Sequence, residues 1–207
     1  MRAINYKRHF QLLILAVAAL YLSGPIFDRY IPAGDARFYS YFALIGALHA
    51  TCLIVSLEHA ASAVLKVAFV ALAAVLSVLT IILMFAMPAP WDGLRFFLVL
   101  TLGSALGASA YWLVVRQCWL RSLRFRDFIR TITLCPAATL AAWCVMGLVA
   151  WVATMFTPSG LAPDSPISDV NGLMPTIAWW LAFSGSIFWS EARRHATSNA
   201  VKPGLVG

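Results

Sequence analysis

The amino-acid sequence predicts an all-α fold, a polytopic bundle of about six transmembrane helices in a single domain. The first observation is composition: 62% of the 207 residues are hydrophobic and 11% are charged, whereas soluble domains are about half apolar and about a quarter charged. A chain of this size cannot bury so much apolar surface in a water-soluble core. The other two observations are the length of the apolar stretches and the uneven placement of the basic residues.

Six stretches are long enough to cross a bilayer, which takes about 20 mainly apolar residues and at least about 17. They are residues 10–27, 38–56, 67–87, 96–115, 131–156 and 173–190. The segments between them hold most of the Pro, Gly and Asp residues that favour turns. We therefore expect residues 1–190 to form one transmembrane helical domain, and residues 191–207 to form a cytoplasmic tail.

Prolines modify the first, fifth and last stretches. Pro25 and Pro175 lie near stretch ends, where proline fits a first helical turn or else ends or kinks the helix. Pro136 lies inside the fifth stretch and predicts a local bend or a later helix start. The basic and then apolar N-terminus also has the first two parts of a secretory signal peptide, but Pro25 makes the segment YLSGP a poor cleavage site. We expect the first helix to be retained.

Basic residues give the predicted orientation, because short cytoplasmic loops carry an excess of Lys and Arg. If the N-terminus is cytoplasmic, the inner segments hold twelve Lys and Arg and the outer segments hold three. The three outer residues are Arg29, Arg37 and Arg95. We therefore expect both termini in the cytoplasm and the chain in the inner membrane. The scarcity of Asn and Lys is compatible with a GC-rich bacterial genome.

Residues 116–130 carry a third of all the basic residues: Arg116, Arg121, Arg124, Arg126 and Arg130. Their first predicted role is to keep the loop between the fourth and fifth stretches on the cytoplasmic side of the membrane. They also suit anionic inner-leaflet lipids, since each Arg near such a surface contributes about 1 kcal/mol. Polar and apolar residues recur imperfectly at helical spacing here, which predicts an amphipathic helix on the inner leaflet. A cytosolic protein partner is the sharper alternative, and nucleic acid is a third option that we do not expect.

The six stretches contain no Asp, Glu, Lys or Arg. Intramembrane charges usually mark ion pathways or proton relays, so this absence argues against a proton-coupled pump. His49 is the one strongly titratable candidate, and it suits a haem ligand, a quinone contact or a proton carrier. The default interpretation is a neutral imidazole that hydrogen-bonds across a helix interface. Because His9, His59 and His195 lie at or beyond the cytoplasmic boundary, we expect neither bis-histidine haem nor another cofactor.

Small residues recur every four positions in the fourth stretch. Gly103 and Gly107 form a GxxxG pair, and Ser104 and Ala108 repeat the spacing. Small residues at this spacing let two helix backbones approach closely, so we expect this helix to pack tightly within the bundle. Residues 67–87 are instead almost unbroken aliphatic bulk, and we expect that helix to face lipid or a partner subunit.

Motifs of catalysis and metal binding are missing. The sequence has no GxSxG, Walker or HExxH motif, so we assign no catalytic residue and do not expect an enzyme. The four cysteines map to the stretches or to the cytoplasmic side, and we expect no structural disulfide. Five residues of types that ligate metals share that side but lack the spacing of a zinc site. They are Glu58, His59, Cys118, Cys135 and His195, and we expect no metal.

These features predict a small inner-membrane protein that acts as a structural, assembly or sensing subunit of a larger membrane complex, through helix packing and its basic cytoplasmic loop. A protein partner or a homo-oligomer is expected. The alternative is a transporter or oligomeric pore for a small solute or ion, with His49 as a gate. Its lining would be Ser77, Thr80, Thr101, Ser104, Thr139, Ser184 and Ser186. A membrane enzyme or redox subunit centred on His49 and the Trp-rich end of the bundle is the third interpretation.

Overall fold

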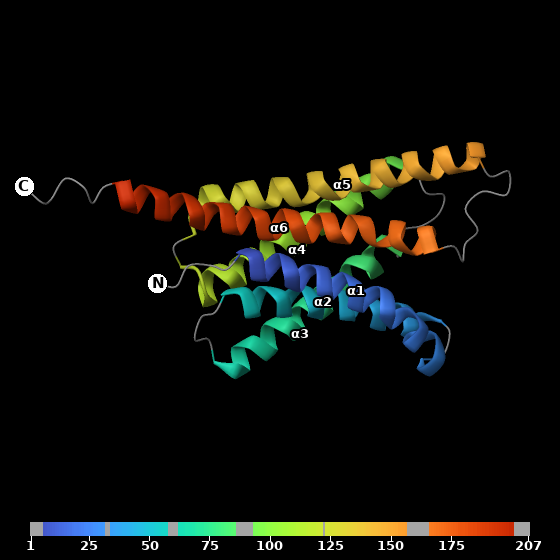
Figure 1. Cartoon of the computed structure of the whole chain (residues 1–207), viewed down its shortest axis with the longest axis horizontal. Coiled ribbons are helices and arrows are strands. Elements are labelled where there is room, and N and C mark those ends of the chain that lie inside the picture. The colour runs from blue at the N-terminus through green and yellow to red at the C-terminus, as the bar shows by residue number, and fades with distance from the viewer. Residues whose placement is uncertain are drawn as a thin grey trace, which may run out of the picture.

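The computed structural model describes residues 6–31, 34–57, 62–85, 93–121, 123–156 and 166–200. The regular structure in these ranges is entirely α-helical (Figure 1). The helices are α1 (Tyr6–Tyr30), α2 (Asp35–Leu57), α3 (Ala63–Phe85), α4 (Gly93–Cys118), α5 (Phe125–Phe156) and α6 (Pro166–Ala200). The predicted all-α class is confirmed for this part of the chain. Helices α1 to α5 are long and apolar enough to cross a membrane, which suggests a membrane protein.

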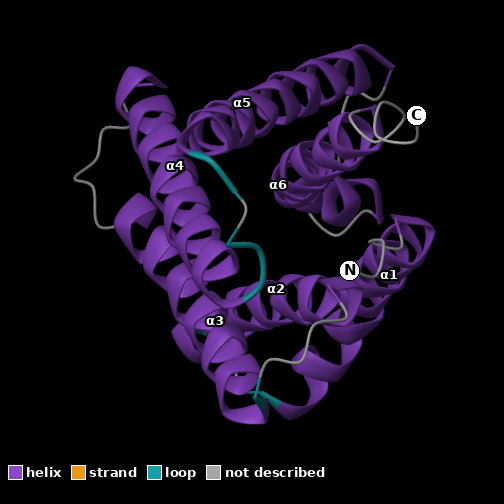
Figure 2. Cartoon of the chain, turned by 90° about the vertical axis from the view of Figure 1, so that its left-hand side faces the viewer, coloured by secondary structure: helices purple, strands orange, loops and turns teal. Residues whose placement is uncertain are grey.

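The helices run up and down in turn, roughly along the longest axis of the molecule (Figure 1). Each packs mainly against its neighbours in the chain, and α1 meets α6 through a sparser contact. Seen end-on, α6 lies between α5 and α1, which brings the last helix back beside the first (Figure 2). The start of α1, the α4–α5 connection and the end of α6 therefore share one end of the bundle. We call it the basic end, because residues 116–130 lie there.

Every helix begins three to seven residues before the apolar stretch that predicted it. Pro25, Pro136 and Pro175 all lie inside helices. The later start predicted for the fifth helix is therefore wrong. Its first turn is stabilised by Asp127, whose Oδ2 accepts the Arg124 backbone N–H at 2.8 Å, as in one half of a capping box. An internal proline removes one donor, and membrane helices tolerate this where neighbouring groups satisfy the freed carbonyl.

Helix α6 holds the sixth predicted stretch but is not among the helices that are apolar enough to span by composition. Its proline, tryptophan and hydroxyl residues lower its mean hydropathy. Three of the hydroxyl residues, Ser184, Ser186 and Ser190, are buried. Helix α3 has the opposite pattern, with Val67 and Val75 exposed. Helix α6 thus buries hydroxyl side chains in the bundle, whereas α3 exposes aliphatic ones. A count of six spans stays a prediction.

Candidate functional site

His49 of α2 lies in the interior of the bundle and is fully buried. Its ring is stacked between Trp180 of α6, at 5.1 Å between ring centroids, and Tyr111 of α4, at 5.5 Å. Trp179 and Phe183 of α6 approach it edge-on, at 5.4 and 5.9 Å. One imidazole therefore joins three helices through four aromatic rings.

The hydrogen bond expected from His49 across a helix interface is not formed. Neither of its ring nitrogens has a hydrogen-bond partner in the part of the chain that the structure describes. The physical reason is that aromatic rings surround the imidazole. An imidazole N–H can form only a weak hydrogen bond to the face of an aromatic ring. The contacts that hold His49 are aromatic contacts, two stacked and two edge-on. Each such contact is worth about 0.5–1.5 kcal/mol beyond the buried area.

His9 occupies a position that the sequence did not single out. It is buried in the first turns of α1, and its Nδ1 lies 2.7 Å from the Ser56 Oγ of α2. The Ser56 hydroxyl donates to the Cys52 carbonyl oxygen, so the imidazole N–H donates to the hydroxyl. Phe188 of α6 meets the His9 ring edge-on at 4.6 Å. His9 thus links α1, α2 and α6 near the basic end.

The small residues predicted to pack on α4 contact three different helices. A Cβ on Gly103 would lie 3.0 Å from the Thr80 Cγ2 of α3, and one on Gly107 would lie 3.7 Å from the Trp179 ring of α6. Ala108 is fully buried in the core.

Ser104 adds polar contacts to the same face of α4. Its Oγ lies 3.4 Å from the Thr139 Oγ1 of α5, and its carbonyl oxygen accepts the Trp179 indole N–H at 3.2 Å. The GxxxG face is therefore used inside the described chain.

Among the described glycines, Gly46 of α2 would bring an added Cβ closest to a neighbouring helix. A Cβ there would overlap the Ala73 carbonyl oxygen of α3 and lie 2.5 Å from the Ser77 Oγ. Gly46 and Ala50 on α2, and Ala73 and Ser77 on α3, repeat the four-residue spacing of small residues. That spacing was visible in the sequence but has no GxxxG motif.

Residues 116–130 do not form the amphipathic surface helix that their pattern predicted. Helix α4 ends at Cys118 and α5 begins at Phe125, and a short connection joins them. Trp119, Leu120 and Leu123 of this connection are buried in the main core cluster. The prediction failed because these apolar side chains find a protein interior to pack in, so they do not need the leaflet.

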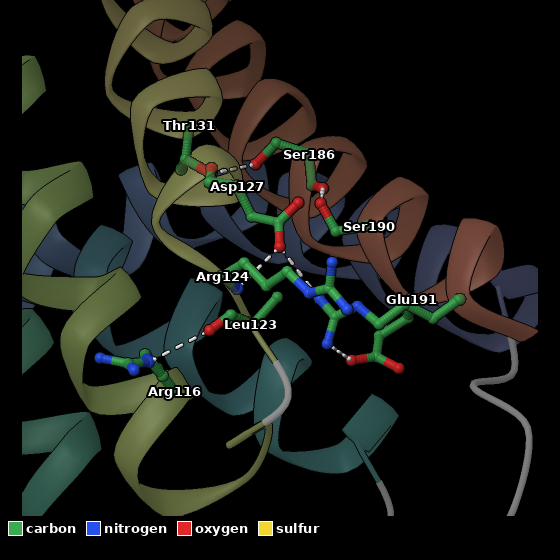
Figure 3. A network of polar contacts seen from close by, with 9 residues as sticks. Arg116, Leu123, Arg124, Asp127, Thr131, Ser186, Ser190 and Glu191 are labelled. Carbon is green, nitrogen blue, oxygen red and sulfur yellow. Dashed lines mark hydrogen bonds and ion pairs between the residues drawn. The ribbon is translucent and has the colours of Figure 1, made fainter.

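Polar contacts hold the same connection to α5 and α6 (Figure 3). Besides accepting the Arg124 N–H, the Asp127 Oδ2 lies 3.1 Å from the Arg194 Nη2 of α6. The Arg194 Nη1 lies 3.4 Å from the Glu191 Oε1, one turn earlier on α6. Asp127 and Glu191 thus share one guanidinium, and the Asp127–Arg194 ion pair ties the start of α5 to the end of α6.

Arg116 holds the connection from the other side. Its Nε donates to the Leu123 carbonyl oxygen at 3.1 Å (Figure 3). Its guanidinium also lies 5.4 Å from the centroid of the Trp112 ring. The connection is therefore braced against α4, α5 and α6, while the side chains of Arg121 and Arg124 on it are exposed. Sequence patterns alone do not reveal this bracing, since Asp127 and Arg194 lie far apart in the chain.

The remaining predicted site residues are dispersed. Arg126 is exposed and Arg130 is half-buried, both in the first two turns of α5. All four cysteines are free. Glu58 and His59 lie outside the described residues, and within those residues no group of three His, Cys, Asp or Glu side chains is placed to hold a metal ion.

Comparison with family models, with curated proteins and with solved structures finds no match for this chain. The case for a function therefore rests on the chain's own residues. Two arrangements stand out: the aromatic enclosure of His49 in the interior, and the braced connection that carries exposed arginines at the basic end.

Proposed function

We propose that this chain is a multi-pass inner-membrane protein that serves as a subunit of a larger membrane complex, and that its basic end faces the cytoplasm and docks an acidic protein partner there. The observation that carries the proposal is the braced α4–α5 connection. Trp119, Leu120 and Leu123 anchor it in the core, and Arg121 and Arg124 are presented outward from it.

Bracing matters because binding costs less when the binding surface is already ordered. Each long side chain or loop that must be fixed on binding costs about 0.5–1.5 kcal/mol. Here the backbone beneath the arginines is already held by two hydrogen bonds, one from Arg116 to the Leu123 carbonyl oxygen and one from the Arg124 N–H to Asp127, which is itself paired with Arg194. A flexible loop that only marks topology has no need of such contacts.

The local charges favour an acidic partner. Asp127 and Glu191 both pair with Arg194 in the bundle, so these carboxylates do not offset the exposed Arg121 and Arg124. Complementary charge speeds association and selects among partners. An acidic face on a neighbouring subunit or a cytosolic protein fits this surface.

The interior supports a packed subunit over a pore. Several of the hydroxyls that a pore would need bond within their own helix, as Thr80 does to the Leu76 carbonyl oxygen and Thr101 to that of Phe97. Others pair across helices, as Thr131 and Ser186 do at 2.8 Å. Aromatic rings enclose His49, the residue proposed as a gate.

The test is gentle solubilisation of the tagged chain from its native membrane, followed by size analysis and identification of co-purifying proteins. We expect a hetero-complex in which an acidic protein is retained by the wild type. Its retention should fall about tenfold or more in Arg121→Gln/Arg124→Gln, and more so at higher salt, because exposed charges are screened.

Two controls make the result specific. Arg121→Lys/Arg124→Lys keeps the charge and should keep most of the partner. Arg29→Gln removes an exposed arginine at the opposite end of the bundle and should change nothing. A partner retained equally by all variants, or a chain that runs alone, would contradict the proposal. In the second case solute flux into liposomes would test the pore alternative.

A further inference from the structure

The outer face of the first turns of α5 combines arginines with large exposed apolar side chains. Arg126 and Arg130 are one helical turn apart. Beside them Phe125 is 72% exposed and Ile129 is 44% exposed, and Leu134 in the next turn is 43% exposed. Arginine and apolar side chains on one helix face are typical of a membrane interface, where apolar groups enter the lipid and charged heads stay at the phosphates.

This face continues along the whole helix. The exposed positions that follow Arg126 and Arg130 at helical spacing are Leu134, Ala137, Ala141, Cys144, Leu148 and Val152. Helix α5 contains a stretch from Phe125 to Val152 that is long and apolar enough to cross a membrane. If α5 spans, this stripe faces the acyl chains, and the two arginines lie at the end of a lipid-facing surface.

The length of α5 places the arginines at headgroup depth. The helix has 32 residues, or about 48 Å at 1.5 Å per residue, whereas the hydrocarbon core of a bilayer is about 30 Å thick. About two turns at each end therefore extend past the hydrocarbon. The first two turns of α5 contain Arg126 and Arg130.

The nearest carboxylate does not neutralise this site. Asp127 is adjacent in sequence, but its Oδ2 accepts the Arg124 N–H and pairs with Arg194 of α6. It is thus engaged with α6, on the inner side of the helix. The arginine-bearing stripe keeps its positive charge.

We propose that Arg126 and Arg130 bind the phosphate of an anionic glycerophospholipid, whose acyl chains lie along Ile129 and Leu134. The guanidinium fork matches phosphate oxygens and can bond them in pairs. This lipid site is separate from the partner surface proposed for Arg121 and Arg124, which are on the connection and not on the lipid-facing stripe. The continuity of the stripe with the lipid-facing side of α5 favours a lipid over a protein as its occupant.

The experiment uses the purified full-length chain with no partner present, so its outcome is independent of the docking proposal. Phosphatidylglycerol and phosphatidylcholine with identical acyl chains are added, and native mass spectrometry measures the bound lipid. The wild type should prefer phosphatidylglycerol. Arg126→Gln/Arg130→Gln should lower that preference by roughly 30-fold, since each arginine near an anionic lipid contributes on the order of 1 kcal/mol.

The matched control is Arg121→Gln/Arg124→Gln, which removes the same charge from the connection and should leave the lipid preference unchanged. Arg126→Lys/Arg130→Lys should restore part of it, and this variant also covers the case in which the glutamine variant folds poorly. Equal binding of the two lipids by the wild type would overturn the proposal. So would an equal loss in both glutamine variants, or complete displacement of the lipid by inorganic phosphate alone.

Discussion

Helices α3 and α6 are opposites in how they use apolar and polar side chains. Helix α3 is largely aliphatic, and it exposes Val67 and Leu79, at 68% and 47%, while burying mainly Phe69 and Ala73. Helix α6 is too polar to qualify as a span by composition, yet it contributes Phe183 and Ile187 to the core with almost no exposure.

The difference shows that the mean hydropathy of a helix does not report how much of the helix is buried. A helix that faces acyl chains must be apolar on its outer side, because nothing there satisfies polar groups. A helix enclosed by other helices can bond its hydroxyls to protein, as Ser186 does with Thr131. Helix α3 thus exposes much of its aliphatic surface, whereas α6 buries its serines against neighbouring helices.

The largest expected change in the free energy of unfolding comes from replacing isoleucine by alanine, and this change should differ between α6 and α3. Ile187→Ala on α6 removes a side chain that is 1% exposed, and Ile82→Ala on α3 removes one that is 37% exposed. The first should lower the free energy of unfolding by about 2–5 kcal/mol, because it leaves a cavity. The second should cost less than about 1 kcal/mol, since mobile acyl chains can fill the space left at an exposed position. Reversible unfolding in mixed micelles, followed by circular dichroism, measures both, and equal losses would remove the distinction.

A smaller effect tests how closely α3 is held against α2. Gly46→Ala places a methyl group against the Ala73 carbonyl, whereas Gly147→Ala on α5 adds one with nothing within 4 Å. Gly46→Ala should lower the free energy of unfolding by about 1–3 kcal/mol through overpacking. The second should gain up to about 1 kcal/mol, because alanine is the better helix former. The same unfolding assay gives both signs, and a neutral Gly46→Ala would show that the two backbones can separate freely.

The smallest effect isolates the polar bond between α5 and α6. Thr131→Val and Thr133→Val each lose a hydroxyl bond to a carbonyl oxygen of their own helix, but only Thr131 also bonds Ser186. The free energies of unfolding of the two variants should differ by about 0.6 kcal/mol, and by no more than about 1.7 kcal/mol. A double-mutant cycle with Ser186→Ala checks it. A coupling energy of zero would mean that this hydrogen bond does not stabilise α6 in the interior.

Much of the fold follows from simple sequence rules, because apolar length and turn residues mark each helix. The first residue of each helix does not follow from these rules, since the helices begin several residues before the apolar stretch, among polar residues. Phe125 begins α5 six residues before the predicted start because Asp127 stabilises the first turn. Pro136 did not delay it, since a single missing donor does not outweigh the rest of the helix.

The candidate site was less predictable. The sequence predicts the five arginines as one group, but it wrongly predicts a surface helix for the connection that carries two of them. The burial of Trp119 in this connection depends on contacts with distant residues such as Phe69. His49 was found as the polar residue of its span, but its aromatic neighbours come from α4 and α6. Periodicity within one helix carries no information about such partners.

We predict that α6 crosses the membrane with the other helices and that the basic end is cytoplasmic. Single cysteines test it directly in a variant whose four native cysteines are replaced by alanine. The exposed positions suited to this are Ala36 at the opposite end, Arg121 on the connection and Ala192 near the end of α6. A membrane-impermeant maleimide should label Ala36→Cys in intact cells, and Arg121→Cys and Ala192→Cys only in inverted vesicles. Labelling of Ala192→Cys from the same side as Ala36→Cys would show that α6 does not cross. Labelling of Arg121→Cys in intact cells would place the basic end outside the cytoplasm and contradict the account.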